Sequence, residues 1–200
     1  MKNLEHTPYF CNLDIPVTTP ISLPKEKWPC GDKTKELITL CETEILTPDV
    51  LNFFNKVFPD YYIRSTMLIY DPPKWNDHRI HTDGSSKEMI FNFAINWVLS
   101  DHPEHYTQWF KAIEPPVFTE NKYKQQYDLW NESQVELVKS TNSKGPFILN
   151  TGIPHRGYNL SDVDRWVLSI RFKHKDLKYR PTYEDAMTLL DDYITDTPTN

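Results

Sequence analysis

Apolar side chains change their spacing along the chain, and this change separates helix-forming from strand-forming segments. In residues 47–58 they recur three to four positions apart, at Val50, Leu51, Phe54 and Phe58. This is the spacing of one face of a helix. The segment opens with Thr-Pro, an N-cap residue followed by a residue favoured at the first helical position. The pattern therefore predicts a helix packed on a sheet.

Two further helices are predicted. One runs from Asp32, a candidate N-cap, to about Glu44, and the other is the C-terminal segment 183–194. Before them, residues 1–30 carry prolines at positions 8, 16, 20, 24 and 29. Because proline restricts the backbone, we expect this segment to form an extended N-terminal wrap.

From residue 61 onward, runs rich in β-branched and aromatic residues alternate with turn residues, which is typical of strands. The predicted strands are 62–70, 89–99, 106–110, 116–118, 146–150 and 165–172, of which 89–99 is the longest. Residues 119–142 are polar and are interpreted as an insertion that holds a strand or a short helix. Helices, then many short strands, then a helix indicate an α+β, mainly β fold with an antiparallel core.

Composition places the chain among soluble proteins of one domain, residues 1–200 with a core at about 62–172. The formal net charge is −6 and the pI is about 5.6, which makes nucleic acid an unlikely partner, although a local basic groove is compatible with it. Three cysteines without a Cys-x-x-Cys motif favour a reducing, intracellular setting. Since no apolar run is long enough for a membrane span or a signal segment, we expect a cytoplasmic protein. The oligomeric state is left open.

A histidine followed two positions later by an acidic residue occurs three times in the sequence. With 28 acidic residues among 200 and seven histidines, about one such pair is expected by chance. The pair at His102 lies in a polar stretch, and the pair at His174 has no later histidine to complete a site. Only His81 and Asp83 lie between two strand-like runs, with His155 following at a similar strand edge.

Two histidines and a carboxylate in this order are typical of the facial triad that binds non-haem Fe(II) and leaves the remaining coordination positions open. Arg165 follows ten residues after His155, at the start of an apolar strand, and supplies the charge to hold a dicarboxylate. One face of this strand carries Arg165, Val167, Ser169 and Arg171. Arg171 is expected near the mouth of a barrel or in solvent. The alternative for Arg165 is a surface ion pair with Asp162 or Asp164.

Several motifs then identify a family resemblance over about half of the chain. They are Tyr70-Asp-Pro-Pro, Ala94-Ile-Asn96-Trp-Val-Leu, Thr107-Gln-Trp-Phe, and Leu149-Asn-Thr-Gly-Ile-Pro-His155-Arg-Gly-Tyr-Asn159 followed by Arg165. Through them, residues 62–172 resemble the Fe(II)/2-oxoglutarate oxygenases, particularly the prolyl- and aspartyl-hydroxylase-like branches. The termini and the insertion at 119–142 are not covered, so the resemblance does not transfer a substrate.

The resemblance implies a double-stranded β-helix, or jelly-roll, core with the N-terminal helices packed on the sheet and a C-terminal helix. It implies that His81, Asp83 and His155 bind iron and that Arg165 pairs with the C5 carboxylate of 2-oxoglutarate. Tyr70 would lie beside this cosubstrate. Asn96 would also contact it, although Asn92 lies on the same strand face and competes for that role.

The implied activity is a dioxygenase that uses Fe(II), 2-oxoglutarate and O₂ to hydroxylate a C–H bond of a peptidyl residue or a small metabolite, releasing succinate and CO₂. A cupin-like metal hydrolase with Zn or Mn, and a non-catalytic binding domain on the same barrel, are the alternatives. Loops inserted into a rigid barrel commonly determine specificity. We therefore expect residues 119–142 to border the mouth of the site, the alternative being a surface segment without a role.

Overall fold

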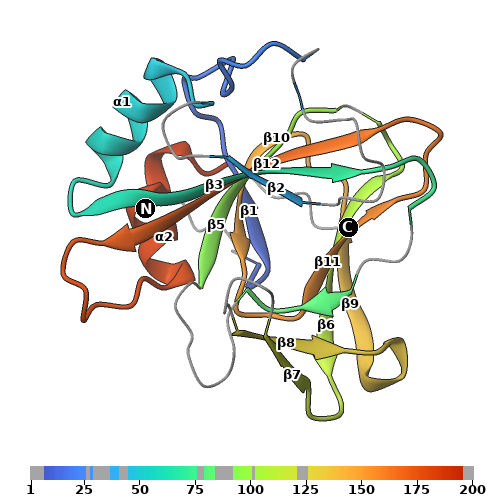
Figure 1. The fold of residues 1–200 in the computed structure, drawn as a ribbon. Coiled ribbons are helices and arrows are strands. Elements are labelled where there is room, and N and C mark those ends of the chain that lie inside the picture. Colours follow the sequence, from blue (N-terminus) through green and yellow to red (C-terminus); the bar gives the residue numbers. More distant parts are fainter. Residues whose placement is uncertain are drawn as a thin grey trace.

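The β-rich runs of the sequence form two antiparallel sheets (Figure 1). The computed structural model describes residues 7–25, 28, 37–40, 45–75, 79–83, 92–100, 102–120 and 126–195. Within these residues each sheet has six strands, and the fold is mainly β, as predicted. None of the helices described is both long and apolar enough to cross a membrane.

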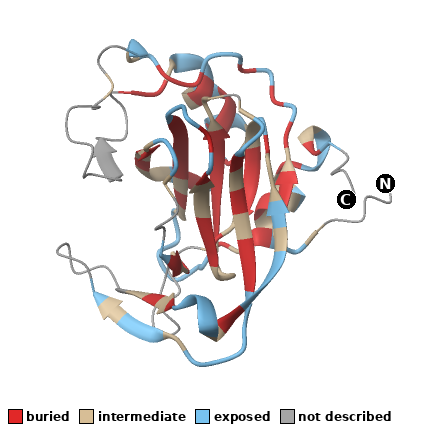
Figure 2. Ribbon diagram, turned by 90° about the vertical axis from the view of Figure 1, so that its right-hand side faces the viewer, coloured by how far each residue is buried: buried red, intermediate tan, exposed pale blue. Residues whose placement is uncertain are grey.

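The first sheet, called sheet I, has the strand order β1-β10-β5-β12-β3-β2. Its strands are β1 (Phe10–Asn12), β2 (Leu37–Leu40), β3 (Tyr61–Asp71), β5 (Phe93–Val98), β10 (Gly145–Asn150) and β12 (Arg165–His174). β3 and β12 pair along their whole length, with one shift in register between Arg171 and Phe172. In Figure 2 the strands through the centre of the molecule are buried over most of their length.

The second sheet, sheet II, has the order β7-β8-β4-β11-β6-β9. Its strands are β4 (Ile80–His81), β6 (His105–Ala112), β7 (Val117–Glu120), β8 (Gln126–Trp130), β9 (Val135–Thr141) and β11 (His155–Asn159). A short 3₁₀ turn, Glu132–Gln134, joins β8 to β9. Sheet II lies at the lower right of Figure 1, and β4 is its shortest strand.

The main core lies between one face of sheet I and the helices. Helix α1 (Pro48–Val57) begins after Thr47, as predicted, and buries Val50, Phe53 and Phe54. Helix α2 (Tyr183–Leu189) is followed by a 3₁₀ turn, Asp191–Tyr193, so the predicted C-terminal helix is shorter than expected. Side chains of both helices join one apolar cluster with residues of β3, β5, β10 and β12. The opposite face of sheet I is thereby left to sheet II, and the side chains that meet there form the candidate site.

One predicted helix is wrong, and a segment with two alternatives is decided in favour of strands; sheet pairing explains both outcomes. The helix expected at 32–44 contains β2, which pairs with β3, so tertiary pairing outweighs local helix propensity; the rest of that segment lies outside the described residues. The polar segment 119–142, for which a strand or a short helix was expected, forms the strands β8 and β9 of sheet II. β9 is an edge strand with mostly exposed residues, and an edge strand of this kind can be polar.

Two further predictions are partly met. The strand expected at 89–99 forms as β5, Phe93–Val98, but β3 is longer, and residues 84–91 lie outside the described part of the chain. The N-terminal wrap is extended where it is described. It contributes β1 to sheet I and then makes isolated bridges at Leu13 and Ile21.

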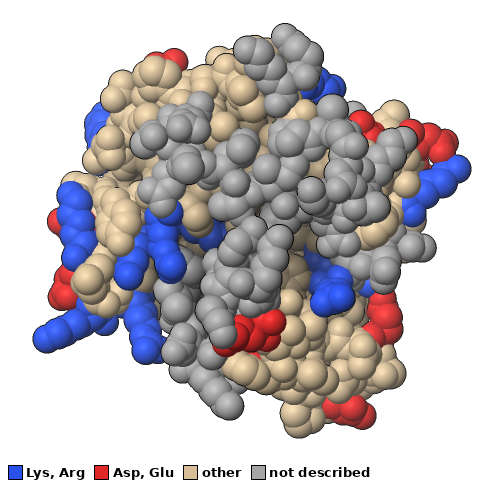
Figure 3. All heavy atoms as spheres, in the orientation of Figure 1, with Lys and Arg blue, Asp and Glu red and all other residues tan. Residues whose placement is uncertain are grey.

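Basic side chains are unevenly distributed on the face shown in Figure 3. A group of them gathers at the left, where β3 begins and β12 ends in Figure 1. The sequence of these strand ends includes Arg64, Lys173 and Lys175. The negative net charge of the chain is therefore compatible with a locally basic surface, as expected.

Candidate metal centre

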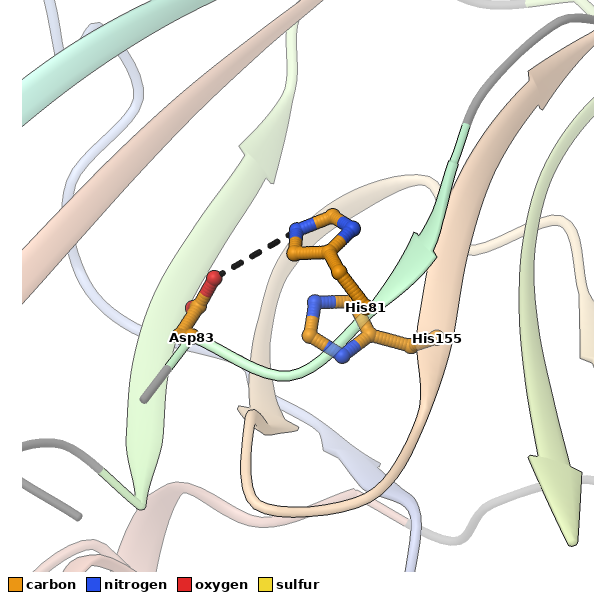
Figure 4. A group of neighbouring side chains, drawn as sticks. All are labelled: His81, Asp83 and His155. Atoms are coloured by element: carbon orange, nitrogen blue, oxygen red, sulfur yellow. Dashed lines mark ion pairs between the residues drawn. The ribbon is translucent and has the colours of Figure 1, made fainter. Parts of the chain in front are cut away.

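Three side chains able to ligate a metal converge on the inner face of sheet II (Figure 4). His81 ends β4, Asp83 follows two residues later, and His155 begins β11, which pairs with β4 at the two histidines. One ligand atom from each residue lies within 4.8 Å of the others. Across the ranges that the structure describes, this is the only such group. The predicted convergence is therefore observed, and ligation itself stays a prediction.

Backbone contacts orient both imidazole rings. The Nδ1 of His81 lies 2.8 Å from the carbonyl oxygen of Arg79, and the Nδ1 of His155 lies 2.9 Å from that of Ile153. An Nδ1–H that donates to a carbonyl leaves the Nε2 lone pair free, which is the usual arrangement of a metal-binding histidine. The Nε2 of His81 lies 3.5 Å from a carboxylate oxygen of Asp83. The ring contacts thus favour coordination through Nε2.

The pKa values of the three groups differ because their surroundings differ. Burial, and then the nearby His81, lower the pKa of His155 to about 4, so its ring is neutral at pH 7. Burial opposes ionisation of Asp83, but the charge of Arg171 and the hydrogen bond with His81 outweigh it and hold the pKa below its usual range. Burial also opposes charging of His81, yet Asp83 raises its pKa. Two ligands are therefore ready for a cation, while His81 must first lose a proton at mildly acidic pH.

Arg171, expected near the mouth of a barrel or in solvent, contacts one of the three converging side chains. Its guanidinium forms an ion pair with Asp83, and its side chain is only 12% exposed, so the expectation of a solvent position is wrong. The sequence did indicate that Arg171 points toward the site, because Arg171 and Arg165 were predicted to share a strand face. What the sequence did not show is that Asp83 lies opposite Arg171.

Arg165 is buried, with 4% of its surface exposed, and its ion-pair partner is Asp71. The two residues are directly paired between β12 and β3. The guanidinium also donates a hydrogen bond of 3.2 Å to the hydroxyl of Thr107. The alternative of a surface ion pair with Asp162 or Asp164 is therefore wrong. Asp71 and Thr107 were missed, because the sequence does not fix strand register.

The guanidinium of Arg165 lies over Gly157 of β11. A Cβ atom at Gly157 would come within 2.9 Å of a terminal nitrogen of Arg165, so the close approach requires glycine. Gly157 is two residues after His155 and therefore faces the same side of the strand, about 7 Å away. Arg165 and the three converging side chains thus face the same space between the sheets.

Several buried polar atoms in this space have no hydrogen-bond partner among the described residues. They include the side-chain oxygens of Asn92, Asn96 and Ser169 and the Nε atoms of Arg165 and Arg171. Asn96 lies directly opposite Ser169 on the neighbouring strand, and both are buried. Buried polar groups are normally hydrogen-bonded, so these atoms indicate a place for a polar ligand. Asn96 faces this space as expected, and Asn92 shares its face.

Tyr70 does not reach the site, and its predicted role beside the cosubstrate needs correction. It pairs with Trp166 across the β3–β12 ladder, so it points away from Arg165 and Asp71 toward the helices. Its hydroxyl donates a hydrogen bond of 3.0 Å to Asp164. Side chains of successive strand residues point to opposite faces, so the next residue, Asp71, faces the site instead.

The two histidines set aside in the sequence lie apart from the converging side chains. His102 stacks near His105, with ring centroids 5.2 Å apart, and approaches Glu104. His174 packs edge-on against Tyr61 at the far end of β12. Neither belongs to the group that could hold a metal.

Comparison with known proteins adds no relative. No protein-family model matches the chain, and no curated protein matches it in sequence. The resemblance of residues 62–172 to the oxygenases is thus carried by the motifs quoted above.

Proposed function

We propose that the chain is an Fe(II)- and 2-oxoglutarate-dependent dioxygenase of the prolyl- and aspartyl-hydroxylase-like type, whose two sheets correspond to the double-stranded β-helix of that family. It would hydroxylate a C–H bond of a small metabolite or peptidyl residue, consuming O₂ and releasing succinate and CO₂. A reducing cytoplasm would keep the iron in its Fe(II) state. The observation that carries the proposal is the buried guanidinium of Arg165, which lies over Gly157, two residues after His155 on β11, and so faces the same space as the triad.

The donor set suits Fe(II). Two imidazoles and one carboxylate on one side leave coordination positions for a chelating cosubstrate and O₂. Bound there, iron supplies the oxygen-activating chemistry, which no protein side chain supplies. His81, Asp83 and His155 would hold it, with the two Nδ1 contacts to backbone carbonyls fixing the rings.

Arg165 would bind the distal carboxylate of 2-oxoglutarate. A guanidinium has five N–H donors, and Asp71 and Thr107 engage its two terminal nitrogens. These contacts hold the side chain in place, while its Nε has no partner among the described residues. The hydroxyl of Ser169 and the amide of Asn96 offer further hydrogen bonds to the same ligand.

Arg171 would act as a positioning residue for Asp83. Its charge keeps the carboxylate ionised despite burial, and its ion pair restrains the side chain that must turn toward the metal. A metal-ligating carboxylate is commonly held by such a partner. Arg171 would therefore act on metal affinity through Asp83.

One observation favours a second candidate, a metal hydrolase on the same ligands. The charge of Arg165 is already balanced by Asp71, so the pair could be structural and the cosubstrate absent. Zn or Mn would then occupy the triad and activate water. The two candidates differ in whether 2-oxoglutarate is consumed.

The test is formation of succinate from 2-oxoglutarate by the purified chain with Fe(II), ascorbate and O₂. We expect slow turnover without added substrate, lost in His155→Ala together with bound metal. His102→Ala is the matched control, since that histidine lies outside the triad, and should keep both. A wild-type chain that binds metal but forms no succinate contradicts the dioxygenase and favours the hydrolase, while absence of metal binding contradicts both and leaves a non-catalytic domain.

A further inference from the structure

A cavity of about 400 Å³ lies against sheet II, and none of its described lining residues has been given a role above. The described residues that line it are Arg79, Val117, Leu129, Trp130 and Asn131. They come from the segment before β4, from β7, and from β8 with the residue that follows it. The volume lies within the range of pockets for small organic molecules, roughly 300–1,000 Å³.

Strand pairing fixes where this cavity lies relative to the metal ligands. Val117 pairs with Leu129, Leu129 pairs with His81, and His81 pairs with His155. Residues directly opposite each other in antiparallel strands point to the same face. Val117 and Leu129 therefore continue the row of the two histidines across the inner face of sheet II and form an apolar floor next to the metal position.

On the side of His155 away from β4, bulky aromatic side chains close this row of residues. His155 pairs next with Trp109, which is fully buried and stacks on Phe10 with ring centroids 5.0 Å apart. Phe147 packs edge-on against Phe10 and completes this aromatic cluster. In contrast, Val117 is 56% exposed. Among the described residues, the β7 side of this row is therefore the more open one, and the Trp109 side is closed.

Arg79 gives the cavity its charge. It is exposed, precedes His81 by two residues and so lies about 7 Å from it along the chain. Among the described residues no ion pair with Arg79 is found, unlike Arg165 and Arg171, which pair with buried carboxylates. A guanidinium without a partner is a ready binding group for a carboxylate or phosphate.

We propose that this cavity is the substrate subsite and that it selects a small molecule with an anionic group on an apolar body. The anion would pair with Arg79, and the apolar part would lie on Val117 and Leu129, which directs a carbon near it toward the metal. This inference rests on the proposed dioxygenase function. It also narrows the substrate from the two classes left open by the sequence to a small anionic metabolite.

The test compares three ligands with the same six-carbon chain, n-hexanoate, n-hexyl phosphate and n-hexanamide, by calorimetric titration of the purified full chain. We expect at least one of the two anions to bind about tenfold or more tightly than the neutral amide, which corresponds to about 1.4 kcal/mol. The carboxylate and phosphate arms show which anion the site prefers. Equal binding of all three, or no binding, overturns the proposal.

Variants then assign the preference to a residue. Arg79→Gln should remove the difference between anion and amide, and Arg79→Lys should keep part of it, because lysine retains the charge without the planar fork. Arg180→Gln is the matched control, since Arg180 is an exposed arginine that does not line the cavity. An anion preference that survives Arg79→Gln overturns the assignment.

A substitution at Val117 tests the apolar floor, and the succinate assay distinguishes failure of this inference from failure of the function on which it rests. Val117→Trp, at an exposed position of an edge strand, should fill the cavity and weaken the binding of all three ligands. If the wild-type chain forms succinate but shows no anion preference, the subsite is wrong and the function stands. If hexanoate binds through Arg79 but no succinate forms, the function is wrong and the cavity is not a dioxygenase subsite.

Discussion

At the scale of single residues, the three predicted ligands start from different protonation states. Asp83 is ionised because its pKa is held low, and His155 is neutral because its pKa is about 4. His81 has a raised pKa and carries a proton at pH 6. Metal ligands must be deprotonated. In mild acid, His81 is therefore the ligand that must lose a proton before the metal binds.

Binding of a divalent metal at pH 6 should therefore release about one proton. The number should fall as the pH rises through the pKa of His81, and the metal affinity should rise with it. Calorimetric titrations in buffers of different ionisation enthalpy measure the released protons directly. Release of two protons at pH 6 would show that His155 is also charged in the metal-free chain, contrary to its surroundings.

The role of Arg165 can be separated from that of Arg171 by substitution to methionine. Arg165→Met should raise the 2-oxoglutarate requirement by about tenfold or more, since about 1.4 kcal/mol is tenfold, and leave metal affinity nearly unchanged. Arg165→Lys should lie between Met and wild type. Arg171→Met should instead weaken metal binding, because Asp83 loses its ion-pair partner.

The readouts are the 2-oxoglutarate dependence of succinate formation and the metal dissociation constant. Because Arg165 is buried against Asp71, its methionine variant removes the ion-pair partner of a buried carboxylate. The double variant that also carries Asp71→Asn removes this buried charge and serves as the folding control. If Arg171→Met produces the large change in 2-oxoglutarate requirement and Arg165→Met does not, the assignment of the anchor is reversed.

At the scale of elements, local pattern predicted the segments that bury a continuous face. Helix α1 and the long strands β3 and β12 carry regular apolar positions, so their places were predicted within a residue or two. β2 was not predicted, because a strand of four residues depends on a partner strand, β3, that is distant in the sequence. In 119–142 a strand was one of two alternatives, and the sequence did not show which strands it would pair with. The strand register that pairs Arg165 with Asp71 could not be predicted either, because it too depends on two strands that are distant in the sequence.

Helix α2 is short and depends on its first turn. The hydroxyl of Thr182 accepts a hydrogen bond of 3.1 Å from the backbone N–H of Asp185, whose carboxylate accepts one of 2.8 Å from Thr182. Thr182→Ala should lower the free energy of unfolding by about 1 kcal/mol. Thr188→Ala is the control, because its hydroxyl only donates to the preceding turn, at Glu184. Urea denaturation of both variants measures the difference, and equal losses would show that the cap contributes nothing.

At the scale of the whole molecule, the two faces of sheet I differ in the polarity of their side chains. The face toward α1 and α2 is apolar and closely packed. The face toward sheet II carries the buried Arg165, the mostly buried Arg171 and several buried polar atoms that have no partner among the described residues. Such groups lower stability unless a ligand satisfies them. The motifs indicated the ligands of this site, but the contrast between the faces emerges only once the sheets are assembled.

Two buried serines give a matched test of this contrast. The hydroxyl of Ser169 has no partner among the described residues, so Ser169→Ala should raise the free energy of unfolding by about 1 kcal/mol and weaken 2-oxoglutarate binding. The hydroxyl of Ser161 contacts His105, Asn159 and Val163. Ser161→Ala should lower the free energy of unfolding by about 1–3 kcal/mol. The urea midpoints of the two variants measure these changes. Destabilisation by Ser169→Ala would show that its hydroxyl already has a hydrogen-bond partner.

The two-residue length of β4 has a consequence for how this protein keeps its shape. Ile80 and His81 join β4 to β8, and a single pair at His81 joins it to β11. An ion shared by His81 and His155 would act as a cross-link between strands that are far apart in the sequence. Closing so long a loop is entropically costly for an unfolded chain, and a ligand that binds only the folded form shifts the equilibrium toward it. The metal would then stabilise the folded state as well as take part in the reaction. Depletion of iron would lower the free energy of unfolding along with the activity.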